Sequence, residues 1–152
     1  MIRAATIDDT QALLELGRRM LEEAPNFRAL PFSASRLEAT LLRLIGDDEA
    51  LVTVAERDGI VIGALIAIAS VHWASEVAVV SELAFFVVPE ARGALVALGL
   101  IARLKEFTLE CGAKLCRAGS STGVDNALVV RLYERAGFVM SGAVLQFSPS
   151  AE

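Results

Sequence analysis

The spacing of hydrophobic and polar residues changes along the chain. Leu13, Leu16 and Met20 recur at helical spacing, and a second helical stripe runs from Leu37 to Ile45. From Ala50 onward, alternating and continuous apolar runs are typical of strands. The expected strands cover 2–5, 50–56, 60–70, 77–88, 114–118, 138–140 and 143–147, and the expected helices cover 6–23, 35–46, 92–111 and 125–137.

Capping and turn residues separate these elements. Thr6 with Asp9 and Ser35 with Glu38 have the spacing of a capping box, in which two side chains satisfy free N–H groups at a helix start. Asp58-Gly59 between two apolar runs is the residue pair of a tight hairpin turn. Asp125-Asn126 is expected to cap the last helix, which Gly137 ends.

The order β-α-α-β-β-β-α-β-α-β-β predicts a mixed α/β domain spanning residues 1–152. Hairpins in the first half imply antiparallel strands, whereas the β-α-β unit from Val77 through Ala118 implies one parallel pair joined by a right-handed crossover. Such a pair can splay at its C-terminal ends, where ligands of open sheets bind.

Charge and composition exclude several classes of function. A net charge of −5 argues against binding of a phosphate backbone and is compatible with a cationic small molecule. The longest apolar runs, Ile60–Val71 and 93–102, are too short to span a bilayer, and we expect no signal peptide. Cys111 and Cys116 are expected to be reduced thiols, and a lone histidine, His72, leaves too few ligands for a metal site. The expected reduced thiols and the expected absence of a signal peptide favour a cytoplasmic protein.

The turn from Pro89 to Gly93 joins an apolar strand to a long helix. Its position favours anion binding, because the first N–H groups of a helix are unpaired and small residues allow close approach. Gly93, Ala94 and Ala97 are small, and the Arg92 side chain adds a charged donor. The alternative is an ordinary turn with a solvated arginine.

Two segments resemble motifs of one enzyme family. The pattern Val87-x-Pro89-x-x-Arg92-Gly93 before a helix is similar to the acetyl-CoA motif of the GNAT superfamily of N-acetyltransferases. Asn126, followed by the run from Leu132 to Phe138, resembles the second cofactor motif of that superfamily. The order of elements also matches from Ile2 to Phe147. One departure is Leu95, which stands where the family loop has its middle glycine, as in glycine-poor bacterial and phage-type members.

The resemblance implies an N-acetyltransferase that moves an acetyl group from acetyl-CoA to a primary amine by direct attack in a ternary complex. It implies that the backbone of residues 85–87 pairs with the pantetheine arm, and that the hydroxyl of Tyr133 protonates the departing thiolate. The implied cofactor-binding residues are Phe85, Phe86, Val87, Arg92, Gly93, Ala94, Leu95, Val96, Ala97, Asn126 and Tyr133. A non-catalytic acyl-CoA-binding or regulatory module on the same fold is the alternative.

Glu82 is the candidate general base. Strand alternation places it on one face with Ala84, Phe86 and Val88, where apolar neighbours raise a carboxyl pKa. A solvent-facing or structurally paired Glu82 is the competing interpretation, and a strand bulge would shift the alignment by one residue. Asn126 is expected to bond the pantetheine arm or to cap its helix, and the two roles are not exclusive.

The sequence does not decide the roles of several other residues. Phe27 and Phe32 either line an acceptor pocket or cover the core, and residues 120–122 either approach the crevice or form a turn. His72-Trp73 is either on the acceptor side or an ordinary surface pair. The high apolar content permits a homodimer. The acceptor itself is not identified by the sequence.

Overall fold

Five strands form one sheet in chain order in the computed structural model, which describes residues 1–149. The first four are antiparallel, whereas β4 and β5 are parallel, as the sequence predicted. The strands are β1 (Ile2–Ala4), β2 (Ala50–Arg57), β3 (Ile60–Val71), β4 (Ala78–Val87) and β5 (Leu115–Arg117). The mixed α/β class with one parallel pair is therefore confirmed.

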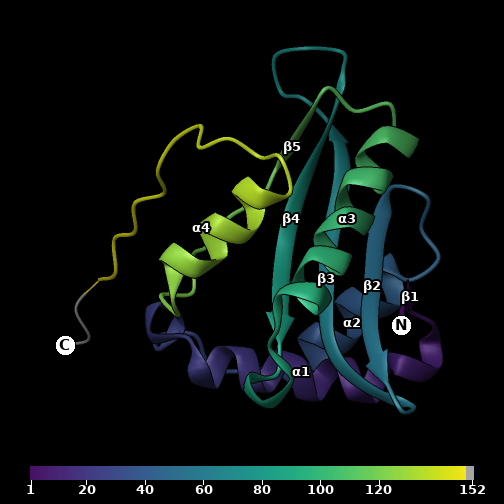
Figure 1. Cartoon of the computed structure of the whole chain (residues 1–152), viewed down its shortest axis with the longest axis vertical. Helices are drawn as coiled ribbons and strands as arrows, with labels where there is room; N and C mark the ends of the chain where they lie inside the picture. The colour runs from purple at the N-terminus through teal and green to yellow at the C-terminus, as the bar shows by residue number, and fades with distance from the viewer. Residues whose placement is uncertain (150–152) are drawn as a thin grey trace.

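Helices cover both faces of this sheet. Figure 1 shows α3 in front of the strands, α1 and α2 behind them, and α4 beside β4. Their bounds are Thr10–Glu23 for α1, Ala34–Leu44 for α2, Ala94–Glu110 for α3 and Asn126–Arg135 for α4, with short 3-10 turns at Ile7–Asp9, Pro25–Phe27 and Pro89–Ala91. The apolar stripes of the helices meet the sheet in one core cluster that includes the fully buried Leu41, Leu65 and Leu104.

The boundaries agree with the sequence at some positions and correct it at others. Asp58 and Gly59 both have positive φ, 52° and 76°, as the predicted hairpin turn requires. The cap of α2 is Ser33 rather than Ser35, because the Ser33 hydroxyl accepts a hydrogen bond from the Arg36 N–H at 3.2 Å. The helix therefore begins at Ala34, one residue earlier than its predicted start.

The two final strands were predicted wrongly. Neither 138–140 nor 143–147 forms a strand among the described residues. A strand is stable only when a neighbour satisfies its backbone groups, and this segment runs along the outer side of α4, away from the sheet (Figure 1). Its alternating pattern favours a strand but supplies no partner for it.

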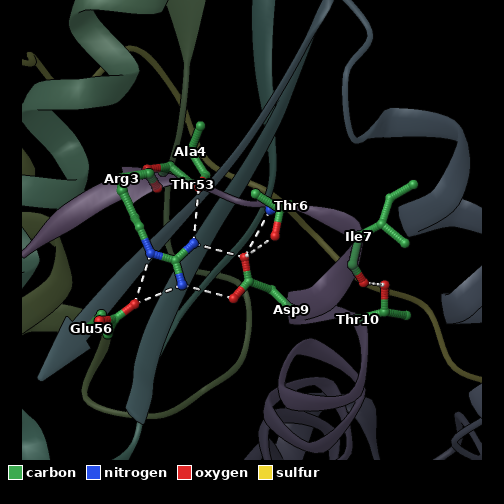
Figure 2. Close-up of polar contacts among 8 residues, drawn as sticks. All are labelled: Arg3, Ala4, Thr6, Ile7, Asp9, Thr10, Thr53 and Glu56. Carbon is green, nitrogen blue, oxygen red and sulfur yellow. Dashed lines mark hydrogen bonds and ion pairs between the residues drawn. The ribbon is translucent and has the colours of Figure 1, made fainter. Parts of the chain in front are cut away.

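A charged cluster ties the N-terminal strand to the first turn and to β2. The Arg3 guanidinium donates to both oxygens of Asp9, at 2.8 Å each, and to Glu56 at 2.7 Å (Figure 2). Asp9 also accepts from the Thr6 N–H at 2.8 Å, which is the predicted capping contact. The Arg3 hydrogen bonds hold the pKa of Asp9 at about 2, below its usual value.

Replacement of Asp9 by asparagine is expected to destabilise the fold by about 2 kcal/mol at pH 7, because hydrogen bonds to charged groups are lost from a nearly buried position. Since its folded pKa is depressed, the Asp9 contribution is present above the ordinary pKa near 4 and is lost as the pH falls toward 2. Urea unfolding at pH 7 and at pH 3 measures this. The advantage of the wild type over Asp9→Asn should be smaller at pH 3 than at pH 7, because pH 3 lies between the folded and the ordinary pKa of Asp9.

A matched control is Glu22→Gln, which breaks an exposed pair with Arg18 on α1. Exposed pairs contribute little, so this variant should unfold like the wild type at both pH values. Equal stability of wild type and Asp9→Asn at pH 7 would show that the cluster in Figure 2 does not stabilise the fold.

Candidate active site

The parallel strand pair separates midway along β4. Hydrogen-bonded partners run only from Val79–Leu115 to Ser81–Arg117, while β4 continues to Val87. The predicted splay is therefore present. Beyond Ser81 the β5-side edge of β4 has no strand partner among the described residues, so its backbone groups can pair with an extended ligand.

A cavity of about 310 Å³ lies at this opening, and it is called the splay cavity below. Seven of the eleven predicted cofactor-binding residues line it: Phe85, Phe86, Val87, Arg92, Gly93, Ala94 and Ala97. The other lining residues are Met20, Glu23, Thr122, Val124, Asp125, Leu128, Val129 and Leu132. The two motifs, which are more than 25 residues apart in sequence, thus face one another across one space.

The start of α3 forms one wall of the splay cavity. Gly93 is the N-cap, and the first intrahelical hydrogen bond runs from the Ala97 N–H to the Gly93 carbonyl at 3.2 Å. The N–H groups of the first turn therefore have no acceptor within the helix. A Cβ built on Gly93 would meet no atom within 4 Å, so the approach to these groups is open.

Leu95 and Val96 do not line the splay cavity. The Leu95 side chain is 89% exposed, which means that it lies in solvent on the outer side of the helix start. Leu95, which stands where the sequence resemblance implies a glycine, therefore does not fill this cavity.

The Arg92 guanidinium is already hydrogen-bonded. Its Nε donates to the Val87 carbonyl at 3.0 Å, its terminal nitrogens bind Glu23, and its central carbon lies over the Phe86 ring, 5.6 Å from the ring centre. An arginine has five N–H donors, so two remain for a further acceptor. An anion in the splay cavity would share Arg92 with Glu23, a partner that the sequence offered no signal to find.

Tyr133 is the fourth predicted cofactor-binding residue that does not line the splay cavity, and it forms a hydrogen-bonded pair with Glu82, which directly follows the last residue of β4 that pairs with β5. The Tyr133 hydroxyl, on a side chain that is 5% exposed, donates to the Glu82 carboxylate. Burial raises the pKa of Glu82 to about 7, against the opposing effect of hydrogen bonds from Tyr133 and the Gly119 N–H. Burial and the nearby Glu82 charge also raise the pKa of Tyr133, so the tyrosine is neutral near pH 7.

A bulge corrects the predicted face of Glu82. The β3–β4 pairing shifts register between Ile66 and Ala67, which oppose Ala84 and Glu82 respectively and leave Leu83 without a partner. Glu82 therefore shares a face with Phe85, not with Ala84, Phe86 and Val88. This is why it meets Tyr133, whose ring also packs edge-on against Phe85.

At the start of α4, Asp125 and not Asn126 is the helix cap. Asp125 is the N-cap, in left-handed conformation with φ 40°, and its carboxylate accepts from the Leu128 N–H at 3.2 Å. The Asn126 side chain instead accepts from the Ser120 hydroxyl at 2.6 Å. Asn126 thus caps nothing and does not line the splay cavity. It joins α4 to the loop that follows β5.

A second cavity of about 300 Å³ lies between α1, α2 and the sheet, and it is called the apolar cavity below. Its lining residues are Leu13, Leu16, Gly17, Met20, Leu21, Pro31, Phe32, Ser33, Arg36, Leu37, Thr40, Leu41, Ala64, Ile66, Ala84 and Phe86. Met20 and Phe86 line both cavities, which therefore adjoin there.

The remaining sequence candidates divide between the cavities and the surface. Phe32 lines the apolar cavity, whereas Phe27 lines neither, and Thr122 is the member of 120–122 that reaches the splay cavity. His72 and Trp73 line neither cavity and stack on one another with ring centres 5.6 Å apart. Cys111 and Cys116 are free thiols.

None of the helices within residues 1–149 is both long and apolar enough to cross a membrane. Nor do three or more His, Cys, Asp or Glu side chains of that range gather in a way that could hold a metal ion.

Comparison with known proteins agrees with the architecture. The sequence model of the acetyltransferase (GNAT) family matches residues 15–138. No protein in the curated set matches significantly.

Among solved structures, AAC(6')-Iy in complex with the bisubstrate analog CoA-S-monomethyl-acetylneamine is 19% identical, with a TM-score of 0.77 over 99% of this chain and 98% of that one. A ribosomal-protein-alanine N-acetyltransferase from Brucella melitensis biovar Abortus 2308 is 18% identical, with a TM-score of 0.70 over 97% and 99%. A transcriptional regulator from Bacillus halodurans C-125 is 20% identical, with a TM-score of 0.77 over 97% and 98%. At these identities the likeness is one of fold.

Proposed function

This chain belongs to the acetyltransferase (GNAT) family, and from that premise we propose that it transfers the acetyl group of acetyl-CoA to a primary amine, as one domain over residues 1–152 and without a metal ion. The observation that carries the proposal is the splay cavity, because seven residues predicted from a cofactor motif line one space with the start of α4. AAC(6')-Iy, which shares the fold, was solved with a CoA bisubstrate analog.

The residues around the splay cavity fit a long, phosphate-bearing thioester. The unpaired N–H groups of α3 and the open side of Gly93 suit a pyrophosphate. The edge of β4 at 85–87 has no strand partner, although its Val87 carbonyl already accepts from Arg92, and it suits the amides of a pantetheine arm. Leu128, Val129 and Leu132 of α4 supply an apolar wall opposite. The bound donor would supply an activated acetyl group.

Proton transfer is assigned to Glu82 and Tyr133. The amine nitrogen bonds to the acetyl carbonyl carbon as the carbon–sulfur bond breaks, and the nitrogen releases a proton to Glu82 through water. Tyr133 gives its hydroxyl proton to the departing sulfur, and Glu82 then returns a proton to Tyr133, its hydrogen-bond partner. A carboxyl pKa of about 7 suits this exchange near neutral pH.

The proposal includes a cytoplasmic location and a small amine or peptide amine as partner, rather than a nucleic acid or a membrane. Two free thiols and a net charge of −5 support it. Its test is amine-dependent release of CoA thiol by the purified chain. A chain that binds acetyl-CoA but releases no thiol with any amine is a binding or regulatory module instead.

A homodimer is also proposed, through the segment 138–149. This segment carries no charged side chain, and it exposes Val139, Met140, Val144, Leu145 and Phe147. Natural sheets normally protect an unpaired strand-like segment with charges, so its apolar surface favours pairing with a second copy. The outer edge of β5, unpaired among the described residues, is the site at which the partner segment would add.

The double variant Val144→Asp with Leu145→Asp is expected to be monomeric, because burial of two carboxylates in the interface is unfavourable. Light scattering after gel filtration should give a dimeric mass for the wild type and a monomeric mass for the variant. Leu109→Asp, at an exposed apolar position on α3, is the control and should remain dimeric. A monomeric wild type would contradict the proposed dimer.

A further inference from the structure

The apolar cavity adjoins the splay cavity at two shared side chains, Met20 of α1 and Phe86 of β4. A molecule held between α1, α2 and the sheet would therefore end beside a donor bound along β4. This continuity makes the apolar cavity the natural seat of the acceptor in the proposed function, on which the following inference rests.

Charge is scarce in the lining of the apolar cavity. No Asp, Glu or His lines it, and its one charged residue, Arg36, is exposed at the start of α2 and forms no salt bridge within residues 1–149. Both acids that line the adjoining cavity are already engaged, because Glu23 is bound by Arg92 and the Asp125 carboxylate caps α4. A second ammonium group on the acceptor would lose its hydration there without gaining a counter-charge, and Arg36 would repel it.

We infer that the acceptor is a primary amine on an uncharged apolar body, aliphatic or aromatic, rather than a polyamine or an aminoglycoside. A volume of about 300 Å³ corresponds to roughly ten heavy atoms when each occupies the volume share of a water molecule. Leucine, isoleucine, alanine and phenylalanine side chains form most of the walls, so each methylene of the body that enters the cavity adds favourable burial.

A series of n-alkylamines tests this inference in the wild-type enzyme, with CoA thiol release as the readout. We expect kcat/KM to rise about threefold to fourfold per added methylene until the cavity is full, since a buried CH₂ contributes about 0.8 kcal/mol. Phenethylamine should be a substrate, whereas spermidine and an aminoglycoside should be turned over at least about 100-fold less efficiently than hexylamine.

The variant Gly17→Ala tests whether the acceptor binds in the apolar cavity. A Cβ at Gly17 would collide with Cδ2 of Leu37, so the leucine must move, and both residues line the cavity. The preference should shift toward shorter amines, with kcat/KM for octylamine falling more than for propylamine. Gly99→Ala is the matched control, a glycine in α3 whose Cβ would meet Ile2 and which lines neither cavity.

The outcomes distinguish failure of the inferred apolar acceptor from failure of the proposed acetyl transfer. Efficient turnover of spermidine or an aminoglycoside, or a rate independent of chain length, would overturn the apolar acceptor and leave acetyl transfer standing. An unchanged chain-length preference in a folded Gly17→Ala would show that the acceptor binds elsewhere. Absence of thiol release with every amine would remove the proposed function and this inference with it.

Discussion

Tyr133→Phe is expected to lower kcat about 100-fold, with a change of less than about threefold in KM for acetyl-CoA, because loss of a general acid slows the chemical step rather than binding. The phenylalanine keeps the edge-on contacts with Phe85 and Phe138, so the packing of α4 is retained. Only the hydroxyl that donates to Glu82 is lost. Steady-state kinetics of thiol release give both parameters.

The pH dependence of activity tests whether Glu82, the hydrogen-bond partner of the Tyr133 hydroxyl, is the base. With Glu82 as base, wild-type activity should rise with pH through about 7, where the carboxylate forms. The hydrogen bond from Tyr133 lowers the pKa of Glu82, so its removal should raise that pKa and move the rise in residual activity to higher pH. Glu82→Gln should abolish the rise. An unchanged kcat in both variants would show that neither residue moves a proton in catalysis.

Ala94→Pro is expected to weaken acetyl-CoA binding about 10-fold to 100-fold, because it removes one N–H donor from the proposed pyrophosphate seat. Proline suits the first position of a helix, and Gly93 before it is extended, as a residue preceding proline prefers to be. The melting temperature should therefore be unchanged or slightly higher. Isothermal titration calorimetry measures the affinity.

Ala94→Val is the matched control for this experiment, since it adds bulk at the same site and keeps the N–H. It should bind acetyl-CoA more tightly than Ala94→Pro. Equal affinities for the two variants would mean that the start of α3 does not contribute its backbone N–H groups to binding. The loop would then be only a connection between β4 and α3.

Local signals explain why most of the cofactor loop could be predicted. A proline that ends a strand and a run of small residues that begins a helix act through the backbone of a few neighbouring residues. Gly93, Ala94 and Ala97 accordingly line the splay cavity where the sequence placed them. Leu95 and Val96 share the segment but not the cavity, because the helix turns their side chains away from it.

The position of Glu82 could not be read from alternation. One unpaired residue, Leu83, reverses which face the preceding side chains occupy, and nothing in the local sequence marks it. Partners distant in sequence were hidden for a related reason. Glu23 meets Arg92 only because α1 lies beside the start of α3. Met20 and Phe86 line both cavities only because α1 packs against the sheet, which the local sequence does not show.

The segment after α4 was predicted to form two strands that the described residues do not contain. Its alternating pattern favours a strand, but such a preference does not supply an edge with which to pair. In a single copy it forms no strand, and Leu145 is 92% exposed. The proposed second copy would provide the missing partner.

The central claim is that this chain is an acetyl-CoA-dependent enzyme and not merely an acyl-CoA-binding module. The most direct test is thiol release from acetyl-CoA by the wild type across a panel of primary amines, at a cofactor concentration that calorimetry shows to be saturating. The double variant Tyr133→Phe with Glu82→Gln is the reference. We predict amine-dependent release that falls at least about 100-fold in the double variant. Saturable binding of acetyl-CoA with no release above that reference for any amine would contradict the claim.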